Sequence, residues 1–204
     1  YKRQELLEKG LVKPEDQPRF LNRIHQEADR LVALINDILR LSQLDEGGAL
    51  PHEQVSVLEL AQEAVRSLTA QAAAQAVHIS VTGTAGTVFG VRRLLYEIAR
   101  NLCENAVKYN VPGGSVTVEV AETDRDVTLL VRDTGIGIPE GDQSRVFERF
   151  YRVDKSHSRA IGGTGLGLSI VKHAVAYHHG TLRLESQPGK GTVITVTLPK
   201  EPTE

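Results

Sequence analysis

The stretch GGTGLGLSIV, residues 162–171, places four glycines and a threonine directly before an apolar run. It marks the boundary between a long irregular segment and the last predicted helix, residues 166–178. Gly163, Gly165 and Gly167 leave backbone N–H groups accessible at the start of that helix, where the helix dipole favours an anion such as phosphate. The pattern is weak evidence alone, because no strand leads directly into it and the chain contains no GxxxxGK[ST] loop.

Around this stretch, hydrophobic periodicity predicts an α+β fold, a two-layer α/β sandwich. We expect strands at 55–57, 78–82, 116–120, 127–131, 181–185 and 192–198, and helices at 58–75, 91–109 and 166–178. The strands at 116–120 and 127–131 read as a hairpin, and we expect antiparallel pairing in the sheet. The irregular stretch 133–165 counts against a compact domain unless it is a functional lid.

The N-terminal region has a different pattern. From Pro18 to Asp45, apolar residues step by three and four, which predicts a long helix with an apolar stripe. This stripe is too long to be covered by residues 1–9, so we expect it to pack against another chain in a helical bundle. Gly47 and Gly48 end the helix. The predicted domains are therefore a helical hairpin at 1–48 and a mixed α/β domain at 49–204.

Composition excludes several classes of function. The net charge is −2, which gives no electrostatic reason to expect nucleic acid as a partner. The single cysteine, Cys103, permits no internal disulfide and fits a reducing, cytoplasmic setting. No run is long and apolar enough for a membrane span, and the chain starts without Met, so we expect a fragment of a longer protein.

Two groups of residues could together hold a small nucleotide. Asn101, Asn105, Lys108 and Tyr109 share one face of a predicted helix, and they could bind a hard cation, a phosphate and a base. Asp133 ends a predicted strand within DTGIGIP, where its carboxylate could accept a hydrogen bond from an exocyclic amine. Each has a structural alternative at roughly even odds: Asn101 as a cap or a solvent-facing residue, Lys108 as a solvated charge, Tyr109 as core.

Read in order, four motifs resemble the N, G1, F and G2 boxes of bacterial two-component sensor histidine kinases. They are Asn101–Tyr109 (NLCENAVKY), Asp133–Gly137 (DTGIG), Phe147–Arg152 (FERFYR) and Gly163–Gly167 (GTGLG). The resemblance covers residues 53–199. The helix at 18–45 is also similar to the second helix of that family's dimerisation and phosphoacceptor domain.

The resemblance implies a Bergerat-type ATP-binding fold with ATP and Mg²⁺ as ligands. Asn105 would ligate Mg²⁺ with help from Asn101, and Asp133 would accept the adenine amino group. Lys108 and Arg152 would contact phosphates, Tyr109 would stack near adenine, and residues 154–163 would form the ATP lid. The implied ATP-binding residues are Asn101, Asn105, Lys108, Tyr109, Asp133, Gly135, Gly137, Ile138, Arg152, Lys155, Gly163, Thr164, Gly165, Leu166 and Gly167.

The same resemblance implies a phosphoaccepting histidine on the first helix of the bundle. We find no such H-box in the sequence and expect it to lie upstream of Tyr1. His25 is followed by no nearby proline, and we interpret it as a flanking or exposed residue. We identify no acid or base catalyst, and we interpret Glu97 and Glu104 as surface or structural residues and Cys103 as core.

The expected function is transfer of the γ-phosphoryl of MgATP to a histidine, for relay to an aspartate of a response-regulator receiver domain. The expected assembly is a homodimer of a parent protein anchored in the cell membrane by an upstream segment. One alternative is an ATP-binding and dimerisation module without autokinase activity. Another is a related ATPase, which is disfavoured because those enzymes carry a glutamate in place of Asn101.

Overall fold

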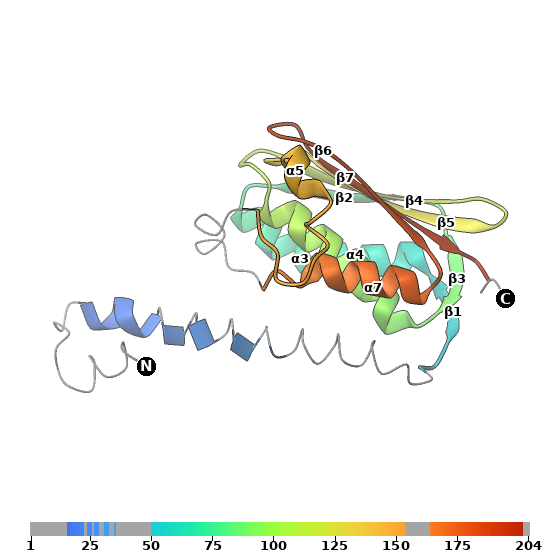
Figure 1. The fold of residues 1–204 in the computed structure, drawn as a ribbon, viewed down its shortest axis with the longest axis horizontal. Helices are drawn as coiled ribbons and strands as arrows, with labels where there is room; N and C mark the ends of the chain where they lie inside the picture. The colour runs from blue at the N-terminus through green and yellow to red at the C-terminus, as the bar shows by residue number, and fades with distance from the viewer. Residues whose placement is uncertain are drawn as a thin grey trace.

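The computed structural model describes residues 16–22, 24, 25, 27, 28, 31, 32, 35, 50–153 and 164–201 (Figure 1). In the N-terminal region, the described residues from 17 to 35 are helical, as expected for the long helix. Their apolar side chains at Leu21, Leu31, Val32 and Ile35 are 53–58% exposed. The predicted first helix of the hairpin and the lid at 154–163 lie outside the described residues.

A five-stranded sheet forms one layer of the α/β domain, with strand order β2-β4-β5-β7-β6. Its strands are β2 (His78–Gly83), β4 (Ser115–Glu122), β5 (Asp126–Asp133), β6 (Thr181–Gln187) and β7 (Gly191–Pro199). The expectation of antiparallel pairing holds for β4–β5, β5–β7 and β6–β7 but is wrong for β2–β4, which is parallel. The reason is that a helix crosses over between β2 and β4 and returns the chain to the same end of the sheet.

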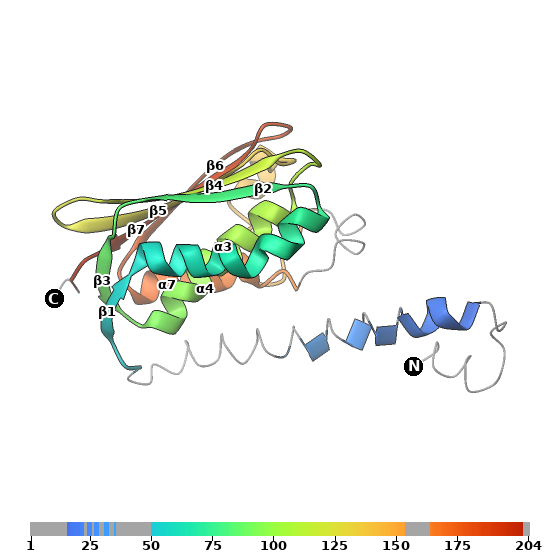
Figure 2. The same cartoon turned by 180° about the vertical axis from the view of Figure 1, so that it is seen from behind.

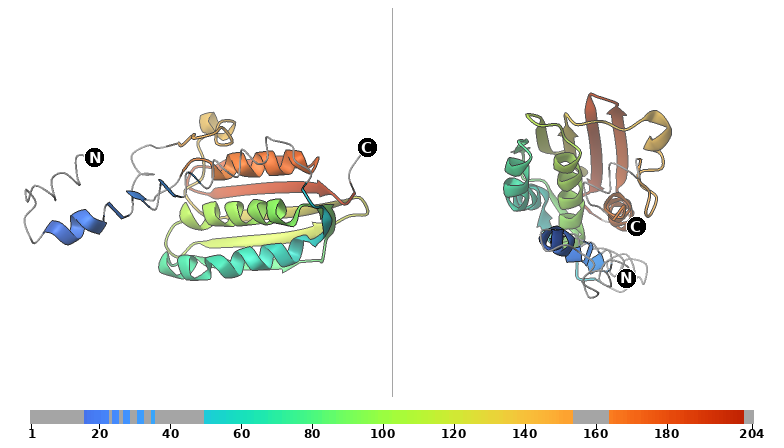
Figure 3. Two further views of the ribbon diagram at one scale, coloured as in Figure 1. Left: turned by 90° about the horizontal axis from the view of Figure 1, so that it is seen from below. Right: turned by 90° about the vertical axis from the view of Figure 1, so that its left-hand side faces the viewer.

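Three helices form the second layer, and they lie side by side under one face of the sheet (Figure 3). They are α3 (Val57–Ala74), α4 (Arg92–Lys108) and α7 (Gly167–Tyr177), close to the predicted ranges. Helix α4 lies in the middle and contacts both neighbours. Fully buried alanines, Ala61 and Ala64 on α3 and Ala99 on α4, allow the helices to approach closely. The predicted two-layer α/β sandwich is confirmed.

A small two-stranded ribbon closes the end of the domain where the chain enters it. Strand β1 (Glu53–Ser56) pairs antiparallel with β3 (Thr87–Gly90), from Glu53 opposite Gly90 to Ser56 opposite Thr87. Figure 2 shows this ribbon beside α3 and the β2 edge of the sheet. Strand β3 was not predicted, because its four residues alternate too briefly to give a periodic signal.

A short helix, α5 (Glu140–Gln143), interrupts the stretch that was predicted to be irregular. Within the described part of the chain, no helix is long and apolar enough to cross a membrane.

Candidate functional site

The polar face of α4 lies at the edge of the core. Leu102, Cys103, Ala106 and Val107 are buried on one side of the helix. The predicted site residues on its other side, Asn101, Asn105, Lys108 and Tyr109, are all half-buried. A half-buried position excludes the interpretation of Tyr109 as a core residue. The helical period therefore brings the four side chains to one rim, as expected.

Asn101 is held in one orientation by the preceding turn of α4. Its Nδ2 donates to the backbone oxygen of Glu97 at 2.8 Å and to the Glu97 carboxylate at 3.2 Å. Its Oδ1 therefore faces the start of α7, where a Cβ built on Gly167 would lie 2.9 Å from it. Of the two alternatives given for Glu97, a surface or a structural residue, its exposed fraction of only 6% supports the second. Glu97 is a structural residue that orients the Asn101 amide.

Asp133 stands at the end of β5, beside the last turn of α4. Its Oδ1 accepts hydrogen bonds from the backbone N–H groups of Gly135, at 2.8 Å, and Thr192, at 3.2 Å. Burial raises the pKa of the Asp133 carboxyl, and these two bonds oppose that rise. Both bonds go to Oδ1 and fix the orientation of the carboxylate.

The glycines after Asp133 let backbone segments pass very close to one another. A Cβ on Gly135 would lie 2.3 Å from the backbone oxygen of Tyr109. Gly137 has φ +68, and a Cβ there would lie 2.1 Å from the backbone oxygen of Gln187. We expected these glycines to make room for a base, and the structure shows that they make room for neighbouring backbone. Their role toward a ligand remains a prediction.

The start of α7 is the predicted phosphate-binding turn, and its role toward an anion remains a prediction. Gly165 has φ +74, and the Thr164 hydroxyl accepts the N–H of Leu166 at 3.3 Å. Leu166 is fully buried and forms a small apolar cluster with Ile170, separate from the main core. Two predicted contacts, Lys155 and Gly163, lie outside the described residues, as do His157 and Arg159 of the predicted lid.

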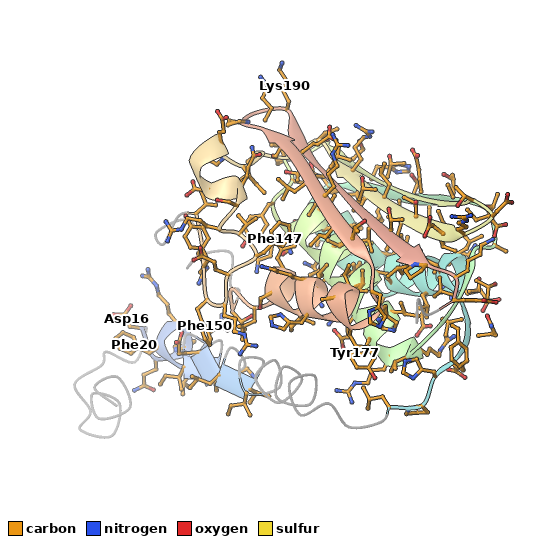
Figure 4. The ribbon with its side chains drawn as sticks, turned by 45° about the vertical axis from the view of Figure 1, so that its right-hand side comes forward. Asp16, Phe20, Phe147, Phe150, Tyr177 and Lys190 are labelled. Carbon is orange, nitrogen blue, oxygen red and sulfur yellow. The ribbon has the colours of Figure 1, made fainter. Side chains whose placement is uncertain are left out.

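The segment Phe147–Arg152 is bonded to α5 on one side and to the turn before α7 on the other. The Tyr151 hydroxyl donates to the carboxylate of Asp142 in α5, and the Arg145 guanidinium lies 4.3 Å from the centre of the Tyr151 ring. The N–H of Phe150 donates to the Gly165 oxygen at 3.0 Å. Figure 4 shows Phe147 and Phe150 near the beginning of α7.

Arg152 lies close enough to Tyr109 to act on it electrostatically. Burial raises the pKa of the Tyr109 hydroxyl, the charge of Arg152 opposes this rise, and Glu104 adds to it. Helix α4, the loop after β5, the Phe147–Arg152 segment and the start of α7 thus meet in one region, the candidate site.

No cluster of three or more histidine, cysteine or acidic side chains suitable for a metal occurs in the part of the chain that the structure describes. A cation here would instead rely on amide oxygens, which suit a hard ion such as Mg²⁺. The fixed orientation of Asn101, with Oδ1 toward the site, fits that requirement. Cys103 does not take part, because it is buried in the core and burial raises the pKa of its thiol to about 12.

A second polar cluster occupies the opposite end of the α4–α7 pair, where Tyr177 is labelled in Figure 4. We call His52, Phe89, Tyr177 and His178 the linker-end cluster. The His52 ring lies 5.8 Å from that of Tyr177 and 5.6 Å from that of Phe89. His178 Nε2 accepts the N–H of Val91 at 3.0 Å, so its Nδ1 carries the proton and donates to the Ala174 oxygen at 2.7 Å.

This cluster was not predicted. Burial lowers the pKa of His178, the nearby His52 and His179 lower it further, and the bond to Ala174 opposes the shift. His178 is therefore a neutral structural histidine, and it joins the end of α7 to the beginning of α4. The Tyr-His-His spacing carries no sequence signal for such a role.

The fold is a two-layer α/β sandwich with polar groups gathered at one end of α4 and α7. The sequence matches the family "Histidine kinase-, DNA gyrase B-, and HSP90-like ATPase" over residues 90–202, more than half of its length, and the chain belongs to that family. Residues 4–47 match the "His Kinase A (phospho-acceptor) domain". The chain is thus the catalytic region of a histidine kinase.

Individual relatives agree with this assignment. The sensor-like histidine kinase SenX3 of Mycolicibacterium smegmatis is 40% identical over 205 residues, which cover 97% of this chain and 53% of that protein. The solved structure of a mycobacterial sensor histidine kinase, MprB, is 33% identical with a TM-score of 0.65 and covers 75% of this chain and 100% of its own. The chain spans about half the length of the SenX3 relative.

A structure of histidine kinase ThkA in complex with the response regulator TrrA has a TM-score of 0.74 over 96% of this chain and 55% of its own, at 22% identity. At that identity the likeness concerns the fold.

The match of residues 4–47 to the phospho-acceptor domain corrects one expectation. We expected the phosphoacceptor motif to be absent from the chain, and this expectation is not borne out by the match. His25 is the histidine within the matched range, and it lies on a described helical position with an exposed side chain.

Proposed function

We propose that this chain binds MgATP and transfers the γ-phosphoryl group to a histidine of its helical domain. The observation that carries this proposal is the convergence of Asn101, Asp133, Arg152 and the start of α7 on one region at the end of α4. Each contributes a different type of group: an amide oxygen, a carboxylate, a guanidinium and backbone N–H donors. Together they match the parts of a nucleotide.

The base end of the site lies between Asp133 and Tyr109. The carboxylate oxygen of Asp133 that is not held by Gly135 and Thr192 would accept the adenine amino group. Tyr109 would lie against the base, and Ile138 would add an apolar contact. Gly135 and Gly137 would allow the base to approach the loop.

The phosphate end lies between the last turns of α4 and the first turn of α7. Lys108 and Arg152 would contact phosphates, and Thr164, Gly165, Leu166 and Gly167 would surround them with backbone donors. Lys155 and Gly163 complete the proposed set. Mg²⁺, held by Asn105 and by the oriented oxygen of Asn101, would neutralise charge that develops on the phosphates.

Asn101 also favours phosphoryl transfer over hydrolysis. The related ATPases carry a glutamate at this position to activate water, whereas an amide cannot accept that proton. Glu97, one turn earlier, is held by its contact with the Asn101 amide. The γ-phosphoryl group would therefore be kept for a better acceptor than water.

The exposed apolar side chains of the N-terminal helix support a homodimer in which two such helices pack together. A response-regulator receiver domain would then take the phosphoryl group from the histidine. The parent protein would be held at the cell membrane by a segment outside this sequence, with the present region in the cytoplasm.

Incubation with γ-labelled ATP and Mg²⁺ tests the proposal, with nucleotide affinity measured in parallel by calorimetry. We expect ATP binding that is lost in Asn105→Ala, and acid-labile label on the protein. His25→Ala tests whether that histidine accepts the label. Binding without label would leave the alternative of an ATP-binding and dimerisation module, release of free phosphate without protein label would indicate an ATPase, and absence of ATP binding would refute the proposal.

A further inference from the structure

Ser186, near the end of β6, joins the loop after Asp133 to the neighbouring hairpin. Its Oγ accepts the N–H of Ile138 at 2.8 Å and donates to the Gly191 oxygen at 3.0 Å. It also lies 2.9 Å from the Thr192 hydroxyl. With its own proton used on Gly191, Ser186 accepts the proton of Thr192. One hydroxyl therefore connects the loop, the hairpin turn and the first residues of β7.

The residues next to Ser186 make the contacts that fix Asp133. The N–H of Thr192 donates to Asp133 Oδ1, and the N–H of Gly189 donates to the Ile136 oxygen at 2.8 Å. The hairpin that connects β6 and β7, with Lys190 at its tip in Figure 4, thus lies directly against the 133–138 loop. Any displacement of the hairpin would displace the donor that orients the carboxylate.

Gln143, in α5, is hydrogen-bonded to both the 133–138 loop and β6. Its Nε2 donates to the Ile138 oxygen at 3.0 Å and to the Ser186 oxygen at 2.9 Å. Three separate segments are thereby tied together: α5, the 133–138 loop and β6. Ser186 and Gln143 hold the backbone of Ile138 on both of its sides, since one accepts from its N–H and the other donates to its carbonyl oxygen.

We propose that Ser186, braced by Gln143, is a positioning residue that sets base selectivity by locking the Asp133 carboxylate in one orientation. Ser186 does not touch the nucleotide in this account. It acts through Ile138 and Thr192, which border the loop that carries Asp133. The inference rests on the proposed function, because it assumes that Asp133 meets the base.

The selectivity follows from hydrogen-bond chemistry. A fixed, ionised carboxylate accepts from the exocyclic amine of adenine, but it faces an acceptor, O6, when guanine is in the same place. A site built around one hydrogen-bonding pattern rejects the wrong base because buried polar groups are left unpaired. A carboxylate that can turn, or a loop that can move away, loses much of that penalty. Loosening of the 133–138 loop should therefore raise the affinity for GTP and lower the affinity for ATP.

Nucleotide affinity of the whole chain provides the test, measured by calorimetry with MgATP and MgGTP. We compare the wild type with Ser186→Ala, with Ser186→Thr, which keeps the hydroxyl, and with Gln143→Ala. The matched control is Ser67→Ala, which removes a serine hydroxyl that donates to the Ala64 oxygen at 2.7 Å on α3, away from the site.

In Ser186→Ala we expect the preference for ATP over GTP to fall about tenfold, the value of roughly one hydrogen bond. Gln143→Ala should act in the same direction, which keeps the inference testable if Ser186→Ala does not fold. Ser186→Thr should restore most of the preference, and Ser67→Ala should leave it unchanged.

Two results would overturn the inference while leaving ATP binding intact. One is an unchanged ratio of ATP affinity to GTP affinity in both Ser186→Ala and Gln143→Ala, including the case in which both affinities fall equally. The other is a wild type that shows no preference for ATP. A wild type that binds no ATP would instead refute the proposed function. A merely structural role of Ser186 would lower stability but would not change the ratio of the two affinities.

Discussion

The two ends of the α4–α7 helix pair use polar groups in opposite ways. At the linker end, His178 satisfies both ring nitrogens within the protein, and the surrounding rings of His52, Phe89 and Tyr177 pack on one another. At the site end, polar side chains such as those of Asn101 and Asp133 are held by one polar atom, and their second polar atom is the one proposed to meet a ligand. The same helices thus end in a closed joint on one side and an open, pre-oriented site on the other.

The difference teaches how to separate stability from function in this fold. A change at the linker end should lower the free energy of unfolding without changing nucleotide affinity in the protein that remains folded. A change at the site end should alter affinity or selectivity more than its effect on stability would predict.

The largest effect is expected at a glycine where the site end meets the β6–β7 hairpin. Gly191 has φ +97, and a Cβ there would lie 2.0 Å from the Asp133 backbone oxygen. Gly191→Ala should therefore lower the free energy of unfolding by about 3 kcal/mol or more and abolish ATP binding. Denaturant unfolding and calorimetry measure the two quantities.

Gly189 is the matched control for that change. It lies in the same hairpin with φ +75, but a Cβ there would meet no atom within 4 Å. Gly189→Ala should lower the free energy of unfolding by only about 1 kcal/mol, because the positive φ is unfavourable for alanine even where space is free. ATP binding should be kept. Equal effects of the two substitutions would show that close contact with Asp133 is unimportant.

At the linker end, His178→Ala removes both bonds of a buried ring and leaves the Val91 N–H without its acceptor. We expect a loss of about 2 to 3 kcal/mol in stability, measured by urea unfolding. ATP affinity at low temperature should be unchanged, because the site lies at the other end of α4. A large loss of affinity in the folded variant would break the comparison between the two ends.

The pH dependence of the free energy of unfolding also tests the structural role of His178. Because the pKa of His178 is lowered in the folded state, the unfolded chain binds more protons below its own histidine pKa of about 6.5. The contribution of His178 to the free energy of unfolding is therefore complete above that pH, and it falls as the pH drops toward the folded-state pKa. Urea unfolding from pH 7.5 to 5 should show a slope that is smaller in His178→Ala.

His78→Gln is the control for the pH series, since His78 is exposed at the start of β2. A wild-type slope that persists in full in His178→Ala would assign the pH dependence to other groups.

The smallest effect is expected at the surface pair between Arg92, at the first residue of α4, and Glu63 on α3. Their side chains approach to 3.0 Å but are 48% and 46% exposed. Arg92→Ala should lower the free energy of unfolding by about 0.5 kcal/mol, and by less at high salt, where the ion pair is screened. A cost above that of His178→Ala would mean that charge pairing, rather than the buried ring, anchors the beginning of α4.

Much of this arrangement could be predicted from sequence, because it depends on periodic side chains. The 3.6-residue period placed Asn101, Asn105 and Lys108 on one face of a helix, and alternating residues located the strands of the main sheet. The end of a strand placed Asp133 at the rim.

The rest depends on backbone groups and distant contacts, which leave no periodic trace. The N–H of Thr192 that fixes Asp133 comes from a strand far along the chain, and any residue except proline could supply it. The bonds of Ser186 and Gln143 likewise join segments that only the tertiary fold brings together. The burial of Glu97 likewise could not be predicted, because its neighbours in sequence do not show which side of α4 is covered.

The strand order has a further consequence for how the domain is made. Strand β7 follows β6 in the chain but inserts between β5 and β6, so the sheet lacks an inner member until residues 191–199 have emerged from the ribosome. The linker end depends on the same segment, because the N–H of Phe89 is bonded to the Lys200 oxygen. A nascent chain that pauses before residue 191 would expose the edges of β5 and β6 together, and both ends of the helix pair can close only after residues 191–200 have emerged.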